Sequence, residues 1–77
     1  MPRGYKNRIT IDPNVMVGKP VIAGTRVPVY LVFRKLAQGM KTDEILRDYP
    51  RLTEEDVRAA IWYGAEAIAG EEVYAWG

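Results

Sequence analysis

Two clusters of carboxylate side chains are the groups in this sequence most capable of chemistry. They are Asp43-Glu44 and Glu54-Glu55-Asp56. Neighbouring carboxylates can bind metal ions or act as general acid and base. Each cluster, however, directly follows a threonine, Thr42 or Thr53, that can cap a helix, and acidic residues in a helix first turn are stabilised by the helix dipole. A structural role therefore accounts for both clusters without catalysis.

Several residue types that enzymes and metal sites rely on do not occur. The chain has no histidine and no cysteine, and serine is also absent. The usual general base, the thiol nucleophile and the commonest metal ligands are therefore missing. Gly18 and Gly24 do not have the spacing of a phosphate-binding loop. We expect a protein that is not an enzyme and that holds no metal and no cofactor.

Length and composition predict one folded domain. Residues 1–77 are 48% hydrophobic, and we divide them into a flexible arm (1–7), a β element (8–27), three helices (28–69) and a tail (70–77). Domains of this size bury only roughly 60% of their unfolded surface and often oligomerise. No apolar run approaches the ~20 residues that span a membrane, and none follows the basic N-terminus. We therefore expect a cytoplasmic homodimer or higher homo-oligomer.

The β element is predicted from alternation and turn residues. Between Arg8 and Asp12, Ile9 and Ile11 face one way while Arg8 and Thr10 face the other, as in a half-buried strand. Val21-Ile22 can form a hairpin with residues 25–27 through a turn at Ala23-Gly24. We expect the first strand to pair across a dimer axis, and we expect the path of the hairpin to be fixed by Gly18, Pro20, Gly24 and Pro28.

Three helices follow. The first is predicted at about 28–38, before Gly39; the second begins at Thr42 as its cap and ends before Pro50. The third begins at Thr53, which forms a capping box with Asp56, and ends at Gly70. Leu52 and Val57 occupy its hydrophobic-staple positions. Its buried stripe is predicted to comprise Val57, Ala60, Ile61, Gly64, Ala65 and Ile68. The fold class is thus mainly α: a helix-turn-helix-like bundle of three helices with an N-terminal β-hairpin.

Charge distribution suggests where nucleic acid would bind. The second and third helices match a helix-turn-helix layout, but the usual recognition element, the start of the third helix, carries three acids that would repel phosphates. Residues 1–35 hold seven Lys or Arg against Asp12 alone, and residues 36–77 carry a net charge of −5. The candidate nucleic-acid-binding residues therefore lie in the basic half: Arg3, Lys6, Arg8, Thr10, Arg26, Arg34 and Lys35. An ordinary solvated face, or neutralisation within a dimer, would explain the same charges.

Large apolar side chains near the C-terminus suggest a protein partner. The candidate partner-binding residues are Trp62, Tyr63, Val73, Tyr74 and Trp76, because Trp and Tyr are favoured interface anchors. Burial in the core or in a dimer is the alternative for Trp62 and Tyr63. For the tail residues the alternative is disorder.

Two stretches of sequence resemble a known family. RITIDPNVMVGKPVIAGTRVPV and TDEILRDYPRLTEEDVRAAIWYGAE, which lie between Arg8 and Glu66, are similar to the small prokaryotic domain-of-unknown-function family 433. GKPVIAGTRVPV is the most specific part. The resemblance implies a homeodomain-like or helix-turn-helix-like fold with an N-terminal β element. It also implies a VapB-type antitoxin whose partner is a PIN-like ribonuclease toxin, and whose complex represses its own promoter.

Two functions of different classes remain open from the sequence. The first is an antitoxin and autorepressor, which would neutralise its toxin by steric occlusion and bind operator DNA through the basic half. The alternative is a protein-interaction adaptor or dimerisation module with no DNA binding. Within the GKPVIAGTRVPV segment, which we interpret as a structural hairpin, Arg26 is the residue expected to contact phosphate or toxin.

Overall fold

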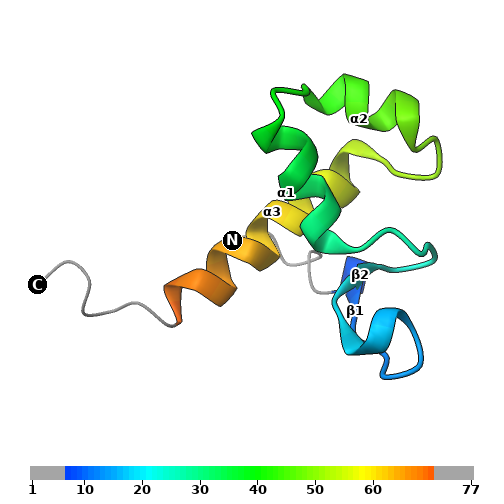
Figure 1. Ribbon diagram of the computed structural model, residues 1–77, viewed down its shortest axis with the longest axis vertical. Coiled ribbons are helices and arrows are strands. Elements are labelled where there is room, and N and C mark those ends of the chain that lie inside the picture. Colours follow the sequence, from blue (N-terminus) through cyan, green and yellow to red (C-terminus); the bar gives the residue numbers. More distant parts are fainter. Residues whose placement is uncertain (1–6, 71–77) are drawn as a thin grey trace, which may run out of the picture.

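Helices dominate the structure, and a short antiparallel sheet precedes them (Figure 1). The computed structural model describes residues 7–70. In chain order, the elements of this part are β1 (Ile9–Thr10), the 3₁₀ turn η2 (Met16–Gly18), β2 (Val21–Ile22), α1 (Val29–Ala37), α2 (Thr42–Asp48) and α3 (Glu54–Ala69). The fold class predicted from the sequence, mainly α with an N-terminal hairpin, is confirmed.

The strand β2 lies between two neighbouring segments. On one side it pairs antiparallel with β1, in the register Ile9 to Ile22 and Thr10 to Val21. On the other side the Ile22 N–H donates to the Val27 carbonyl at 2.9 Å, and Val21 forms a bridge with Pro28. Gly24, with φ at +79°, makes the turn that returns the chain. The predicted turn at Ala23-Gly24 is therefore present, and pairing of β1 across a dimer axis stays a prediction.

The first strand is shorter than its alternating sequence predicts. It ends at Thr10, and Ile11, which was expected to be buried beside Ile9, is 58% exposed. The cause is the turn that Asp12 starts: its carboxylate accepts the Asn14 N–H, and its carbonyl accepts the Val15 N–H, both at 2.9 Å. This turn takes the chain away from β2 before Ile11 can pack. The 3₁₀ turn η2 that follows was not predicted.

The first two helices begin and end close to their predicted positions. The helix α1 ends in a Schellman motif. Gly39 has φ at +91°, and the Met40 N–H donates to the Lys35 carbonyl at 3.1 Å. The cap predicted for α2 is wrong by one residue. Thr42 is the first helical residue, and the N-cap is Lys41, whose backbone N–H donates to the Glu44 carboxylate at 2.7 Å. The start of α2 is therefore stabilised by the Glu44 carboxylate, and not by the Thr42 hydroxyl as predicted.

The start of α3 follows its sequence pattern closely. The Asp56 N–H donates to the Thr53 hydroxyl at 3.1 Å, and the Thr53 N–H donates to the Asp56 carboxylate at 3.0 Å. The predicted capping box is confirmed, with Asp in the place where Glu is usual. Leu52 and Val57, at the staple positions, are both buried. This junction sets the direction in which α3 leaves the preceding turn.

A single core joins β2 and the three helices. Its buried members are Ile22, Val29, Val32, Ile45, Leu52, Val57 and Ala60, so β2, each helix and the turn before α3 contribute to it. Full burial of one such aliphatic side chain contributes roughly 1.5–3 kcal/mol. Where α1 and α3 pack together, Gly64 faces the Phe33 ring so closely that a Cβ atom at position 64 would collide with it. The small residue is therefore needed for this helix contact.

The stripe predicted to be buried along α3 is wrong in its second half. Val57 and Ala60 are buried, but Ile61 is 40% exposed, Ile68 is 64% exposed, and Ala65 is exposed. The reason is a difference in length: α1 has nine residues and α3 has sixteen. Figure 1 shows the end of α3, in orange, reaching beyond the other elements. A helical pattern identifies apolar positions but not how far the neighbouring helix extends.

Two further properties concern residues 7–70 alone. None of the helices there combines the length and the apolar character needed to cross a bilayer. The same residues contain no group of three or more acidic side chains placed to hold a metal ion.

We predict that replacement of Gly64 by Ala will destabilise the protein. The new methyl group must displace the Phe33 ring, which typically costs about 1–3 kcal/mol, and the better helix propensity of Ala returns only about 1 kcal/mol. Chemical denaturation should therefore show a lower free energy of unfolding for Gly64→Ala. Gly70→Ala is the matched control, because a Cβ there meets nothing closer than the Glu66 carbonyl oxygen at 3.5 Å. Equal stability of the two variants would contradict the assigned helix contact.

Candidate functional site

The tip of the β-hairpin is fixed by the side chain of Thr25. Its hydroxyl donates to the Ile22 carbonyl at 2.7 Å and accepts the Val27 N–H at 3.0 Å. The Thr25 N–H also donates to the Ile22 carbonyl at 3.0 Å. Because these bonds close the turn on itself, Arg26 is held at the tip with an exposed side chain. A backbone that is ordered in this way loses less conformational entropy when its side chain binds a partner.

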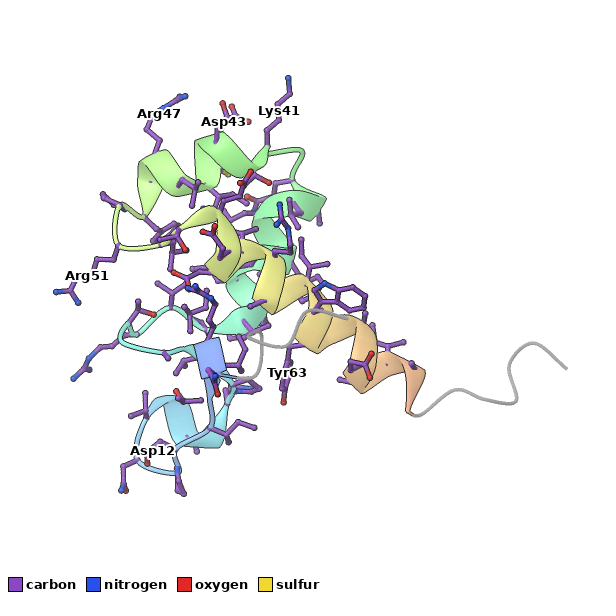
Figure 2. The ribbon with its side chains drawn as sticks, turned by 180° about the vertical axis from the view of Figure 1, so that it is seen from behind. Asp12, Lys41, Asp43, Arg47, Arg51 and Tyr63 are labelled. Carbon is purple, nitrogen blue, oxygen red and sulfur yellow. The ribbon has the colours of Figure 1, made fainter. Side chains whose placement is uncertain are left out.

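The hairpin tip forms one wall of a groove with a volume of about 850 Å³. The opposite wall is the turn between α2 and α3. Apolar side chains line much of the groove, and Val21, Val27, Leu31 and Tyr49 are among them. In Figure 2 Arg51 projects outward from that turn, on the same side of the molecule as the hairpin. An apolar cleft with a few charged groups at its edge is typical of a binding site.

Four charged residues line this groove. Arg26 and Arg51 come from the two opposite walls, and the acids are Asp12 and Asp48. A long contact of 3.5 Å joins Arg51 Nη1 to the Gly24 carbonyl oxygen, which places the Arg51 side chain against the hairpin. The two guanidinium groups thus belong to one surface, although the residues are 25 positions apart in the chain. Paired arginines of this kind recognise carboxylates and phosphates. We call this surface, with its apolar lining, the arginine groove.

Arg8 has a different environment from Arg26. Its guanidinium lies 3.0 Å from the carboxylate of Asp56, which is itself only 8% exposed. Asp56 also accepts the Thr53 N–H, so one carboxylate joins the start of β1 to the start of α3. The Arg8 side chain keeps 43% of its surface exposed. Part of its charge is therefore already compensated within the fold.

The remaining candidates for nucleic-acid binding have other surroundings than Arg8. Thr10 is exposed and lines the arginine groove with Arg26. Arg34 lies over the Tyr30 ring at 4.9 Å from its centroid, and Lys19 lies 5.8 Å from the same centroid. Lys35 is half-buried in the last turn of α1. The basic half of the sequence is therefore distributed over at least three places in the structure.

The structure describes two of the predicted partner-binding residues, Trp62 and Tyr63. Tyr63 packs against the core, and Trp62 is half-buried on the neighbouring side of α3. Five candidates lie outside the described residues, namely Arg3 and Lys6 for nucleic acid, and Val73, Tyr74 and Trp76 for a partner.

Sequence reasoning missed half of the arginine groove. Arg51 directly follows Pro50, which marked a helix end, and gave no functional signal. Lys19 and Tyr30 were missed as well, although they form a cation–aromatic cluster with Arg34. Arg51 is distant in sequence from the hairpin, and Lys19 belongs to an irregular segment, so the tertiary arrangement places these two residues. Tyr30 and Arg34 are four residues apart in α1, so helical spacing was the signal that could have found their contact.

Comparison with known proteins assigns this fold to a family. Residues 9–63 match the model of a protein family described as "Protein of unknown function (DUF433)". A crystal structure of a DUF433 member from Anabaena variabilis ATCC 29413 superimposes with a TM-score of 0.76 at 39% sequence identity, over 79% of this chain and 60% of that one. The chain belongs to the DUF433 family.

Relatives at the sequence level include proteins from a bacterium and an archaeon. The "Uncharacterized protein y4eO" of Sinorhizobium fredii is 42% identical over 59 residues, which are 77% of this chain but only 26% of that protein. An "Uncharacterized protein" of Archaeoglobus fulgidus is 68% identical over 22 residues, or 29% of this chain and 61% of that one. The chain thus spans about a quarter of the first relative and about three fifths of the second.

We predict that Asp56→Ala will lower the free energy of unfolding by about 2 kcal/mol. The change removes one half of a capping box, worth about 1 kcal/mol, and leaves the Arg8 guanidinium without its partner. Thermal or urea denaturation measures the loss. Glu55→Ala is the matched control, because Glu55 is an exposed acid in the same helical turn. If the two variants lose the same stability, Asp56 does not join β1 to α3.

Proposed function

We propose that this protein is the antitoxin of a toxin–antitoxin pair, and that it binds and neutralises a PIN-like ribonuclease. The arginine groove is the proposed contact. Neutralisation is steric: the hairpin tip covers the nuclease site, and this chain performs no chemistry. The observation that carries the proposal is the pair Arg26 and Arg51 at the edge of an apolar groove.

The two guanidinium groups of the arginine groove, Arg26 and Arg51, suit an acidic partner, although Asp12 and Asp48 line the same groove. A nuclease of this type has an acidic active site, and guanidinium groups form their strongest hydrogen bonds with carboxylates. The apolar lining supplies the desolvated surface that surrounds such contacts in stable interfaces. The backbone that carries Arg26 is also held in place before binding by the Thr25 hydrogen bonds. These features favour a protein partner over a small-molecule substrate.

Autorepression by DNA binding is the second part of the proposal. Its support is the cluster formed by Lys19, Tyr30 and Arg34, whose two cations could contact phosphates. The start of α3 is not the proposed reading element, because Glu54 and Glu55 are exposed there and would repel the DNA backbone. Without this second part, the protein would be an adaptor that binds its partner and no DNA.

The proposed toxin contact predicts a selective effect of two arginines. We expect Arg26→Ala and Arg51→Ala each to weaken binding to the nuclease by about tenfold or more, since central interface arginines typically contribute more than 1 kcal/mol. Co-purification with the product of the neighbouring gene, followed by calorimetric titration, measures the change. Arg47→Ala is the control: Arg47 is exposed, lies outside the groove and pairs with Asp43 at 3.8 Å. Equal binding by all three variants would exclude the groove as the contact.

The DNA part is tested separately by a gel shift on the promoter region. We expect a shift that weakens steeply between about 50 and 200 mM salt, because neutralised phosphates release counterions. Lys19→Ala combined with Arg34→Ala should reduce this shift without reducing toxin binding. A stable toxin complex with no gel shift at either salt concentration would exclude autorepression. The protein would then be an adaptor that binds its partner and no DNA. The absence of any complex would overturn the antitoxin proposal itself.

A further inference from the structure

Asp48 is an acid at a position where a helix disfavours one. It is the last residue of α2, it is exposed, and it lines the arginine groove. The carbonyl end of a helix carries a partial negative charge, so an acid there is repelled, whereas a cation such as Arg47 is favoured. Asp48 therefore weakens the helix that carries it, and helix stability does not explain its presence.

The two acids of the groove differ in what they contact. The Asp12 carboxylate accepts the Asn14 N–H at 2.9 Å and so has a structural role in a turn. In the described part of the chain, Asp48 takes part in no ion pair and in no side-chain hydrogen bond. Arg51, three residues further on, points instead to the Gly24 carbonyl oxygen, which lies 3.5 Å from its Nη1 atom. The Asp48 carboxylate is thus available to a partner.

We infer that Asp48 binds a cationic side chain of the partner, so that the arginine groove selects a protein segment of mixed charge over nucleic acid. The inference rests on the proposed nuclease contact and specifies it. The segment presents a carboxylate to Arg26 and Arg51, and a Lys or Arg to Asp48. Tyr49 also lines the groove and lies between Asp48 and Arg51 in the chain. An apolar side chain between the two charges of the segment would therefore meet the Tyr49 ring.

A groove with both signs of charge discriminates between partners. A protein segment can place opposite charges against both signs, whereas a nucleic acid presents phosphates, and phosphates that reach the two arginines also approach Asp48. Specificity of this kind depends on a repulsive element against the wrong partner. Asp48 thereby distinguishes the groove from the proposed DNA contact, which consists of two cations and the Tyr30 ring.

The inference is tested by comparing Asp48→Asn with Asp43→Asn. Both variants remove one exposed negative charge from α2, but Asp43 lies outside the groove, and Figure 2 shows it on the side of α2 that faces away from the hairpin. We expect Asp48→Asn to weaken nuclease binding by about threefold or more in calorimetric titration, and Asp43→Asn to leave it unchanged. The melting temperature of Asp48→Asn should not fall, because the helix end loses an unfavourable charge. Loss of contact is thereby separated from loss of folding.

The direction of the change distinguishes this inference from the groove proposal. If Asp48→Asn strengthens nuclease binding while Arg26→Ala weakens it, Asp48 only repels an acidic partner. The inference then fails and the groove proposal stands. If Arg26→Ala and Arg51→Ala both leave nuclease binding unchanged, the groove is not the contact, and the inference fails with the groove proposal.

An indirect effect through Arg51 is tested by combining variants. Asp48→Asn should weaken nuclease binding by a similar factor in the unmodified chain and in Arg51→Ala, because the two residues bind different groups of the partner. If Asp48→Asn has no further effect in the Arg51→Ala chain, Asp48 only orients Arg51, and the inference is overturned.

Selection against nucleic acid is measured without the nuclease. A short DNA duplex of arbitrary sequence is titrated with each asparagine variant at about 50 mM salt, where phosphate contacts are strong. We expect Asp48→Asn to bind the duplex about twofold or more tighter than Asp43→Asn, because only the first variant removes an acid from beside the groove arginines. The two variants have the same net charge, so a difference reports the position of the charge. Equal affinities would overturn the selection even where a nuclease partner is confirmed.

Discussion

The arrangement of the whole domain depends on where the Asp56 carboxylate lies. It accepts the Thr53 N–H at 3.0 Å and pairs with Arg8 at 3.0 Å, with only 8% of the residue exposed. One group thus closes the first turn of α3 and holds the strand element against it. Beneath this junction, Leu52 and Val57 form the hydrophobic staple, and both are buried. An acid that is paired and hydrogen-bonded in this way is a structural requirement, so the acidic start of α3 is explained by folding and needs no catalytic or DNA-reading role.

The second constraint is the difference in length between α1 and α3. The shorter helix, α1, covers α3 as far as Gly64. There the Phe33 ring occupies the space that a side chain at position 64 would need. Beyond that point α3 has no neighbour in the described part of the chain, yet its sequence stays apolar. The first half of the helix therefore belongs to the core, and its second half is exposed. The arginine groove lies beside the turn that precedes α3, away from this exposed second half of the helix.

Local sequence patterns predicted the elements well, but not how they pack together. Thr53 and Asp56 are three residues apart, and Gly39 directly follows Gln38, the C-cap of α1, so short-range rules were sufficient for these caps. Ile11 and Ile68 follow equally good patterns and are nevertheless exposed. Their burial required a neighbour that the fold does not supply: Asp12 turns the chain away in one case, and α1 ends too early in the other. The Arg26 and Arg51 pair was similarly beyond sequence reasoning, because the two walls of the groove meet only after folding.

The uneven charge of the sequence also has a different meaning once the fold is known. Arg8 is partly neutralised by Asp56, Arg34 lies over Tyr30, and Arg26 faces the groove. Such scattered cations would give the chain only a few phosphate contacts on any single face, and few contacts mean weak binding.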